Sequence, residues 1–66
     1  MLFGTRLREL RLEKNLTQKQ LAEVFNVHHT SIRDWEIRGK QPSYETLCKL
    51  AKFFEVTADY ILGLED

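Results

Sequence analysis

The chain has 66 residues, of which 42% are hydrophobic and 30% charged, a composition typical of a folded globular protein and unlike that of a disordered one. Its length fits one small domain, residues 1–66, and no apolar run approaches the roughly 20 residues that span a bilayer, so we expect a cytoplasmic protein without membrane contact. The formal net charge is zero, without the basic surplus usual for nucleic-acid-binding proteins, and the single cysteine, Cys48, excludes an internal disulfide.

Apolar residues recur at helical spacing from the start of the chain. The first predicted helix has its inward positions at Phe3, Leu7 and Leu10. We expect it to end near Asn15, since asparagine can serve as a left-handed cap. A second helix, about residues 18–25, follows a capping box formed by Thr17 and Gln20 and stops at Asn26, whose residue type tolerates a positive φ.

A third helix is predicted from His29 to about Glu36, with Ile32 and Trp35 facing inward. The residue before it, His28, stands where a cap is expected. Imidazole is a poor cap, so the pattern defines this start less sharply than the others.

Two more helices complete a chain that has no strand pattern. Gly39 and Pro42 separate the third helix from a fourth, and Ser43 caps the fourth helix. The inward positions of the fourth helix are Leu47, Leu50, Ala51 and Phe54. Thr57 caps a short fifth helix, and Gly63 ends it. The sequence therefore predicts an all-α fold, a compact bundle of five helices.

Residues 18–37 have the pattern of two helices that cross at a tight turn, an arrangement that lets the second helix enter the major groove of DNA. The positions where these helices face each other and the core are all apolar or small: Leu21, Ala22, Phe25, Val27, Ile32 and Trp35. At about 100° per residue, the outward positions of the second helix are then Thr30, Arg33, Asp34 and Ile37, flanked by His29 and Ser31.

The charges are unevenly distributed along the chain. Residues 1–20 hold five basic and two acidic residues, a net charge of +3, whereas residues 44–66 hold two basic and five acidic residues, a net charge of −3. Such a charge dipole allows a basic end to face DNA, although many proteins that bind no DNA are equally uneven.

Four segments carry a family resemblance: Leu-Thr-Gln-Lys-Gln-Leu-Ala at 16–22, Ser-Ile-Arg-Asp-Trp-Glu at 31–36, Gly-Lys-Gln-Pro-Ser-Tyr-Glu-Thr-Leu at 39–47 and Asp-Tyr-Ile-Leu-Gly at 59–63. Together they resemble the Cro and phage-repressor family of bacterial DNA-binding domains, the xenobiotic-response-element type. The resemblance implies a lambda-repressor-like five-helix bundle that binds operator DNA, commonly as a dimer, to repress or switch transcription. Three residues depart from the family pattern, namely Asn26 in place of a turn glycine, His28 in place of a Ser or Thr cap, and Gly39, which comes one residue late.

By position, the resemblance implies that His29, Thr30 and Asp34 contact bases and that Arg33 reaches a base or a phosphate. The side-chain chemistry adds detail, because arginine binds guanine O6 and N7, aspartate accepts from a cytosine amine, and a threonine methyl contacts a thymine methyl. The alternative interpretation is that Arg33 and Asp34 only solvate an exposed helix face.

Phosphate contacts are predicted at both ends of the two-helix unit. Thr17 and Gln18 open the second helix, whose N-terminal amides and dipole favour an anion. Arg38 and Lys40, in the loop after the third helix, can bind the DNA backbone on the other side. A solvated loop charge is the alternative for each.

Two structural roles complete the predicted set. The resemblance implies that Arg11 and Glu36 form a partly buried ion pair that joins the first helix to the third. A core this small has more large apolar side chains near the C-terminal end than it needs, so we expect a symmetric dimer contact at Phe53, Tyr60 and Leu64. Such a dimer presents two recognition helices about 34 Å apart to a pseudo-palindromic operator.

No catalytic or metal chemistry is predicted. His28 and His29 point about 100° apart on a helix and cannot readily share a metal ion. The sequence has no nucleophile with a base and an orienting acid and no glycine-rich phosphate loop, so we expect neither an enzyme nor a cofactor. The prediction is a transcriptional repressor that binds double-stranded DNA. Two alternatives stay open: an antitoxin or adaptor whose main partner is another protein, and the N-terminal part of a longer regulator.

Overall fold

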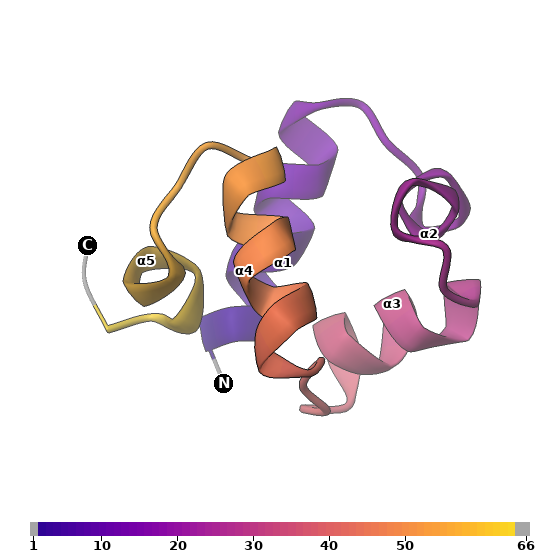
Figure 1. Cartoon of the computed structure of the whole chain (residues 1–66). Helices are drawn as coiled ribbons and strands as arrows, with labels where there is room; N and C mark the ends of the chain where they lie inside the picture. The colour runs from indigo at the N-terminus through magenta and orange to yellow at the C-terminus, as the bar shows by residue number, and fades with distance from the viewer. Residues whose placement is uncertain (1, 65–66) are drawn as a thin grey trace.

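The computed structural model describes residues 2–64, and within that range it contains five helices and no strand. The helices are α1 (Leu2–Glu13), α2 (Gln18–Phe25), α3 (His29–Ile37), α4 (Tyr44–Phe53) and α5 (Ala58–Leu62). The predicted all-α class is confirmed. In Figure 1, α2 and α3 lie on one side of the molecule, α4 crosses in front of α1, and α5 lies on the other side. None of the helices in the described range is long and apolar enough to cross a membrane.

The helices begin and end where local side-chain chemistry allows. Three hydroxyl residues cap α2, α4 and α5, each accepting the backbone N–H of the third helical residue: Thr17 from Gln20, Ser43 from Thr46 and Thr57 from Tyr60. The stops at Asn15, Asn26 and Gly63 have φ values of 57°, 55° and 83°, as their residue types favour. Capping, turn and periodicity signals therefore agree with the fold at nearly every boundary.

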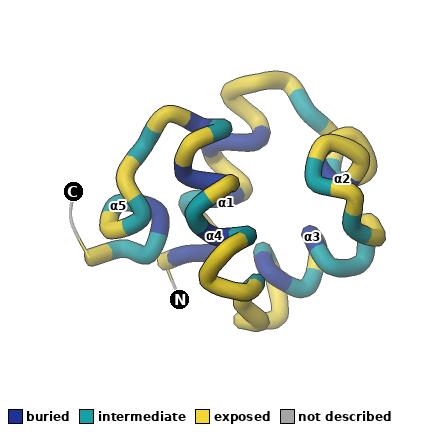
Figure 2. The backbone as a smooth tube through the Cα atoms, in the orientation of Figure 1, coloured by how far each residue is buried: buried dark blue, intermediate teal, exposed yellow. Residues whose placement is uncertain are grey.

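The core lies where the five helices converge, and Figure 2 shows the buried segments turned toward that centre. Its largest fully buried side chains are Phe3, Leu7, Leu21, Ile32, Leu50 and Ile61. Of the residues predicted to face inward around the α2–α3 turn, Leu21, Ala22, Ile32 and Trp35 are buried, while Phe25 and Val27 are half-buried and pack against the cluster.

Two local features were not predicted from the sequence. Gly4 lies in the first turn of α1, and a Cβ at this position would stand 2.7 Å from the carbonyl oxygen of Trp35. The close passage of α1 over the end of α3 therefore requires glycine. The second feature is Glu55, which follows α4 with φ of 58°, although the sequence offers no glycine or asparagine there.

Candidate nucleic-acid interface

The α2–α3 corner is built by a turn that lacks glycine. Asn26 adopts the left-handed conformation and its N–H donates to the carbonyl oxygens of Ala22 and Glu23, while Val27 N–H also reaches the Ala22 carbonyl at 3.0 Å. Asparagine accepts this backbone at low cost. The substitution for the usual glycine therefore leaves the corner intact, and α2 and α3 pack directly on each other.

His28 caps α3 despite its residue type. Its Nδ1 accepts the Thr30 N–H at 3.3 Å and lies 2.9 Å from the Thr30 hydroxyl. Its ring also stacks on the ring of His29, with centroids 4.5 Å apart. The imidazole thus performs the role of a Ser or Thr cap, and it holds the first turn of α3 through both Thr30 and His29.

The four residues predicted to read bases form two adjacent rows on α3. His29 and Arg33 are exposed and stand four residues apart, so they share one face. Thr30 and Asp34 form the neighbouring row and are half-buried. The structure therefore presents His29 and Arg33 to solvent more fully than Thr30 and Asp34.

Asp34 is turned toward the end of its own helix. Its Oδ1 lies 3.7 Å from Nε of Arg38, its side chain is only 22% exposed, and the buried Oδ1 has no hydrogen-bond partner among the described residues. A pair at this distance is ionic and too long for a hydrogen bond. The carboxylate oxygen is thus left with unused accepting capacity.

Among the residues predicted to bind phosphate, Thr17 and Gln18 already have intramolecular roles. The Thr17 hydroxyl accepts from Gln20 N–H, while Gln20 Oε1 accepts from Thr17 N–H at 2.8 Å. The Gln18 amide donates to Oε1 of Glu36 at 3.2 Å, which ties the first turn of α2 to the last turn of α3. The backbone amides of that first turn still point along the helix axis, where an anion is favoured.

Arg38 and Lys40 lie in the segment that leaves α3, and both are exposed. Arg38 closes α3 with its N–H on the Asp34 carbonyl oxygen at 3.0 Å, and Lys40 N–H reaches the same oxygen at 3.3 Å. Gly39 between them has φ of 74°, a conformation that glycine adopts without strain. The late glycine therefore leaves both basic side chains directed into solvent after a properly closed helix.

Arg11 and Glu36 meet across a buried bidentate contact. Arg11 Nε and Nη2 donate to the two Glu36 carboxylate oxygens at 2.7 and 3.0 Å, and Nη1 donates to the Leu16 carbonyl oxygen at 2.7 Å. The two side chains are 8% and 0% exposed. With the Gln18 amide on the same carboxylate, this network connects α1, the α1–α2 loop, α2 and α3.

The residues predicted for a dimer contact are engaged with different helices. The Phe53 ring packs edge-on against Phe25 of α2 with centroids 5.4 Å apart. Tyr60 lies beneath Arg6 of α1, whose Cζ is 4.3 Å from the ring centroid, and Leu64 is 73% exposed. Phe53 thus faces α2, whereas Tyr60 faces α1.

Tyr44 is an exposed residue near this interface that sequence reasoning did not single out. It is the first residue of α4 and is 79% exposed. The Cys48 thiol raises the pKa of its phenol above the ordinary value of 10.0, chiefly through a side-chain hydrogen bond. In the sequence, the only indication that Tyr44 lies near the interface is its position shortly after the Arg38–Lys40 segment.

Known proteins share this pattern. A family model described as helix-turn-helix matches residues 7–61. The transcriptional activator BcrR of Enterococcus faecalis is 46% identical over 66 residues, which are the whole of this chain and 32% of BcrR. The transcriptional regulator ImmR of Bacillus subtilis is 35% identical over the whole chain and 52% of its own length. The cryptic phage CTXphi transcriptional repressor RstR of Vibrio cholerae is 34% identical over 83% of this chain and 50% of RstR.

The chain spans between about a third and about half of the length of these three relatives. The match to the family model covers all of α2, the turn and α3, together with α4 and most of the remaining helices. The chain therefore belongs to the helix-turn-helix family, of the Cro and phage-repressor type.

Proposed function

We propose that this chain is a sequence-specific regulator of transcription that binds double-stranded DNA, with α3 in the major groove. The observation that carries the proposal is the two-sided α3. Ile32 and Trp35 are buried against the core, while His29 and Arg33 share an exposed face four residues apart. A helix of this kind, braced by a second helix across a tight turn, has the geometry that reads base edges.

We propose distinct roles for the base-reading residues. Arg33 is exposed and has the fork geometry for guanine O6 and N7, and His29 stands beside it as a hydrogen-bonding ring. Thr30 can offer its methyl group to thymine while its hydroxyl stays near His28. Asp34 has an unused buried oxygen that accepts from a cytosine amine if the side chain turns away from Arg38.

Binding of the DNA backbone is assigned to the two ends of the unit. The amides of the first turn of α2, at Thr17 and Gln18, meet one phosphate, and Arg38 and Lys40 meet another. Lysine and arginine neutralise phosphates and release counterions, so their share of the affinity depends on salt.

Repression is the regulatory outcome that we propose. The relatives above include one named activator and one named repressor. Occupying an operator excludes other proteins from it and requires no surface besides the DNA-binding face. Activation requires a further contact.

We also propose that two copies bind a pseudo-palindromic site through the end of the chain that carries Tyr60 and Leu64. Leu64 is 73% exposed, so a contact between two copies there would remove its apolar surface from water. A two-fold contact there would set the two α3 helices one DNA turn apart, about 34 Å. Sedimentation that shows a monomer both alone and on DNA would contradict the dimer.

The function is tested by selecting binding sites from random duplexes and then titrating an enriched duplex by fluorescence anisotropy at several salt concentrations. We expect an enriched, two-fold symmetric sequence and an affinity that falls as salt rises. The absence of any enriched site together with flat salt dependence contradicts the proposal.

Two variants separate base reading from phosphate binding. Asp34→Ala should relax specificity at one base pair, whereas Lys40→Ala should weaken all duplexes about equally and lower the salt slope by about 1. The exposed Arg8 on α1 provides a matched control for loss of a positive charge. Equal effects of Asp34→Ala and Lys40→Ala would show that the base-reading assignment is wrong.

A further inference from the structure

A groove of ≈ 500 Å³ lies between the C-terminal part of α2 and α4. It is lined by Val24, Phe25, Asn26, Lys49, Lys52 and Phe53. None of these residues belongs to the set predicted to contact DNA. The groove is therefore separate from the predicted DNA-binding face, and what it binds does not depend on the DNA-binding proposal.

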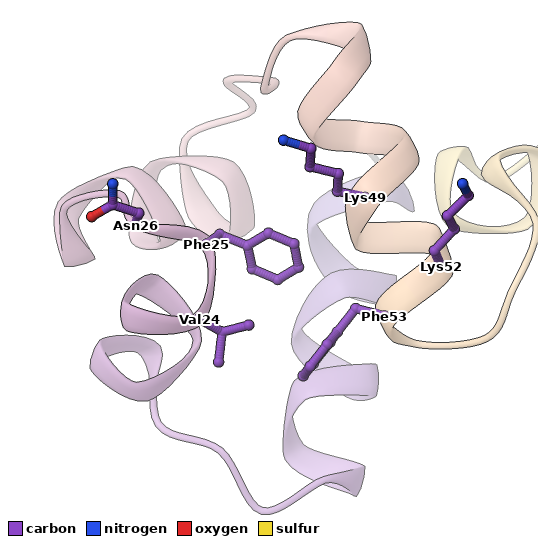
Figure 3. Close-up of a pocket in the computed structure, with 6 residues that line it drawn as sticks. All are labelled: Val24, Phe25, Asn26, Lys49, Lys52 and Phe53. Atoms are coloured by element: carbon purple, nitrogen blue, oxygen red, sulfur yellow. The ribbon is translucent and has the colours of Figure 1, made fainter.

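The floor of the groove is aromatic. Phe25 and Phe53 face each other from α2 and α4 in Figure 3, with their centroids 5.4 Å apart and their planes at 79°. Both rings are only half-buried, and Val24 at the α2 edge is 51% exposed. Three neighbouring apolar side chains thus remain partly in water, in an arrangement that would bury further area on contact with an apolar group.

The rim of the groove is positive. Lys49 and Lys52 are the two charged residues among those that line it, and both extend from α4 in Figure 3. Lys14 adds a third positive charge, since its Nζ lies 5.3 Å from the Phe53 ring centroid. Lys49 pairs with Glu45 at 3.3 Å, but both side chains are largely exposed, so this pair exchanges readily for another carboxylate. The apolar floor is therefore flanked by three lysines, in a chain whose net charge is zero.

A second copy of the chain fits this groove poorly. A two-fold symmetric contact centred on Phe53 would bring Lys49 and Lys52 of one copy near the same lysines of the other. Like charges at such a contact oppose association. This repulsion argues against Phe53 as part of the dimer contact proposed for Tyr60 and Leu64.

We infer that the groove binds an acidic segment of another protein, which places one apolar side chain against Phe25 and Phe53 and carboxylates beside Lys49 and Lys52. The apolar anchor supplies most of the binding energy, as in other interfaces with a central aromatic pocket. The lysines select acidic partners and exclude basic ones. The volume is that of a site for one or two side chains and not for a whole domain.

The proposal is tested by titrating the isotope-labelled 66-residue chain with a short peptide that has one central phenylalanine flanked by glutamates, and following the backbone amides by NMR. The expected shifts gather at residues 24–26 and 49–53. A peptide with lysines in place of the glutamates, and one with serine in place of the phenylalanine, should both bind much more weakly. Shifts that gather elsewhere, equal binding of the three peptides or no binding of the first would overturn the proposal.

Variants at exposed positions give the second arm of the test. Lys49→Glu with Lys52→Glu should weaken the glutamate peptide about tenfold or more, whereas the same charge reversals at Arg8 and Lys19 should have little effect. Val24→Ser should weaken the peptide, and Leu12→Ser, at a similarly exposed apolar residue of α1, should not. Equal losses in test and control variants would show a general charge or solubility effect and would contradict the inference.

Discussion

The backbone of Gly4 lies directly against the carbonyl oxygen of Glu36, so closely that a Cβ on Gly4 would stand 2.5 Å from that oxygen. The contact joins the first turn of α1 to the last turn of α3. About two turns further along the same face of α1, Arg11 holds the Glu36 side chain. The same residue of α3 is therefore fixed through its backbone by one end of α1 and through its carboxylate by the other, which sets the angle at which α3 leaves the core.

Gly4→Ala is predicted to destabilise the fold, against the usual direction for a helix. Alanine in a helix interior normally stabilises relative to glycine by roughly 0.5–1 kcal/mol. Here the added methyl group would overlap the Trp35 and Glu36 carbonyl oxygens, and displacing packed backbone costs about 1–3 kcal/mol. Urea unfolding followed by circular dichroism measures the sign. Thr5→Ala, at the exposed neighbouring position, is the control and should not destabilise; a Gly4→Ala chain as stable as the parent would contradict the close contact.

Arg11→Ala is predicted to lower the free energy of unfolding by about 3–5 kcal/mol, because it leaves the Glu36 carboxylate buried without its cation. Replacing both partners with apolar residues, Arg11→Met with Glu36→Leu, should restore much of this loss, since neither charge then remains in the core. Thermal unfolding of the single and double variants measures both effects. If the double variant is less stable than Arg11→Ala, the loss of stability does not come from the unpaired Glu36 charge alone, and the ion pair itself stabilises the fold.

The sequence was sufficient for most of the fold because its local signals agree with one another. The Thr17 and Gln20 capping box, the Asn26 stop and the inward pairing of Ile32 with Trp35 each pointed to the same α2–α3 corner. These signals depend on neighbours within a few residues, and such interactions can be read from a sequence. The fold class and the family were predicted on this basis and are confirmed.

Apart from the Arg11–Glu36 pair, which the family resemblance implied, features set by contacts between distant segments were not predicted. Gly4 is required by its contact with the backbone of α3, some thirty residues away, and no neighbouring residue in the sequence indicates this contact. The turn of Asp34 toward Arg38 is a local contact over four residues, but it depends on the exact end of α3, which differs by one residue from the predicted bound. The groove between Phe25 and Phe53 lies between α2 and α4, which are not adjacent in the sequence. Side-chain direction on the candidate interface therefore required the structure.

His28→Ser is predicted to stabilise the chain by up to about 1 kcal/mol, because serine is the better N-cap for α3. Its hydroxyl would take over the accepting role that His28 Nδ1 has toward Thr30 N–H. His28→Ala should instead destabilise by about 0.5–1 kcal/mol, since no acceptor remains. Chemical unfolding of both variants measures the difference, with His29→Ser as the control for loss of the stacked ring. If serine and alanine give equal stability, His28 does not act as a cap.

Glu55→Gly is predicted to raise stability by about 0.5–1 kcal/mol. Glu55 has φ of 58°, where a Cβ costs roughly 1–2 kcal/mol that glycine avoids, and part of the gain is offset by the greater freedom of glycine in the unfolded chain. Glu55→Ala, which keeps the Cβ and removes the charge, should show no such gain. A stabilisation of equal size in both variants would mean that the carboxylate, and not the backbone, is unfavourable.

Gln18→Ala is predicted to lower both fold stability and DNA affinity without changing the salt dependence of binding. The Gln18 amide holds Glu36 at 3.2 Å, so its loss should cost roughly 0.5–1.5 kcal/mol of stability and loosen α2 against α3. The amide is neutral and releases no counterion, so the salt slope of binding to the selected duplex should stay that of the parent, in contrast to Lys40→Ala. Stability is measured by urea unfolding and the slope by anisotropy at several salt concentrations. If Gln18→Ala weakens DNA binding while stability is unchanged, the Gln18 side chain contacts DNA directly and its bond to Glu36 contributes little.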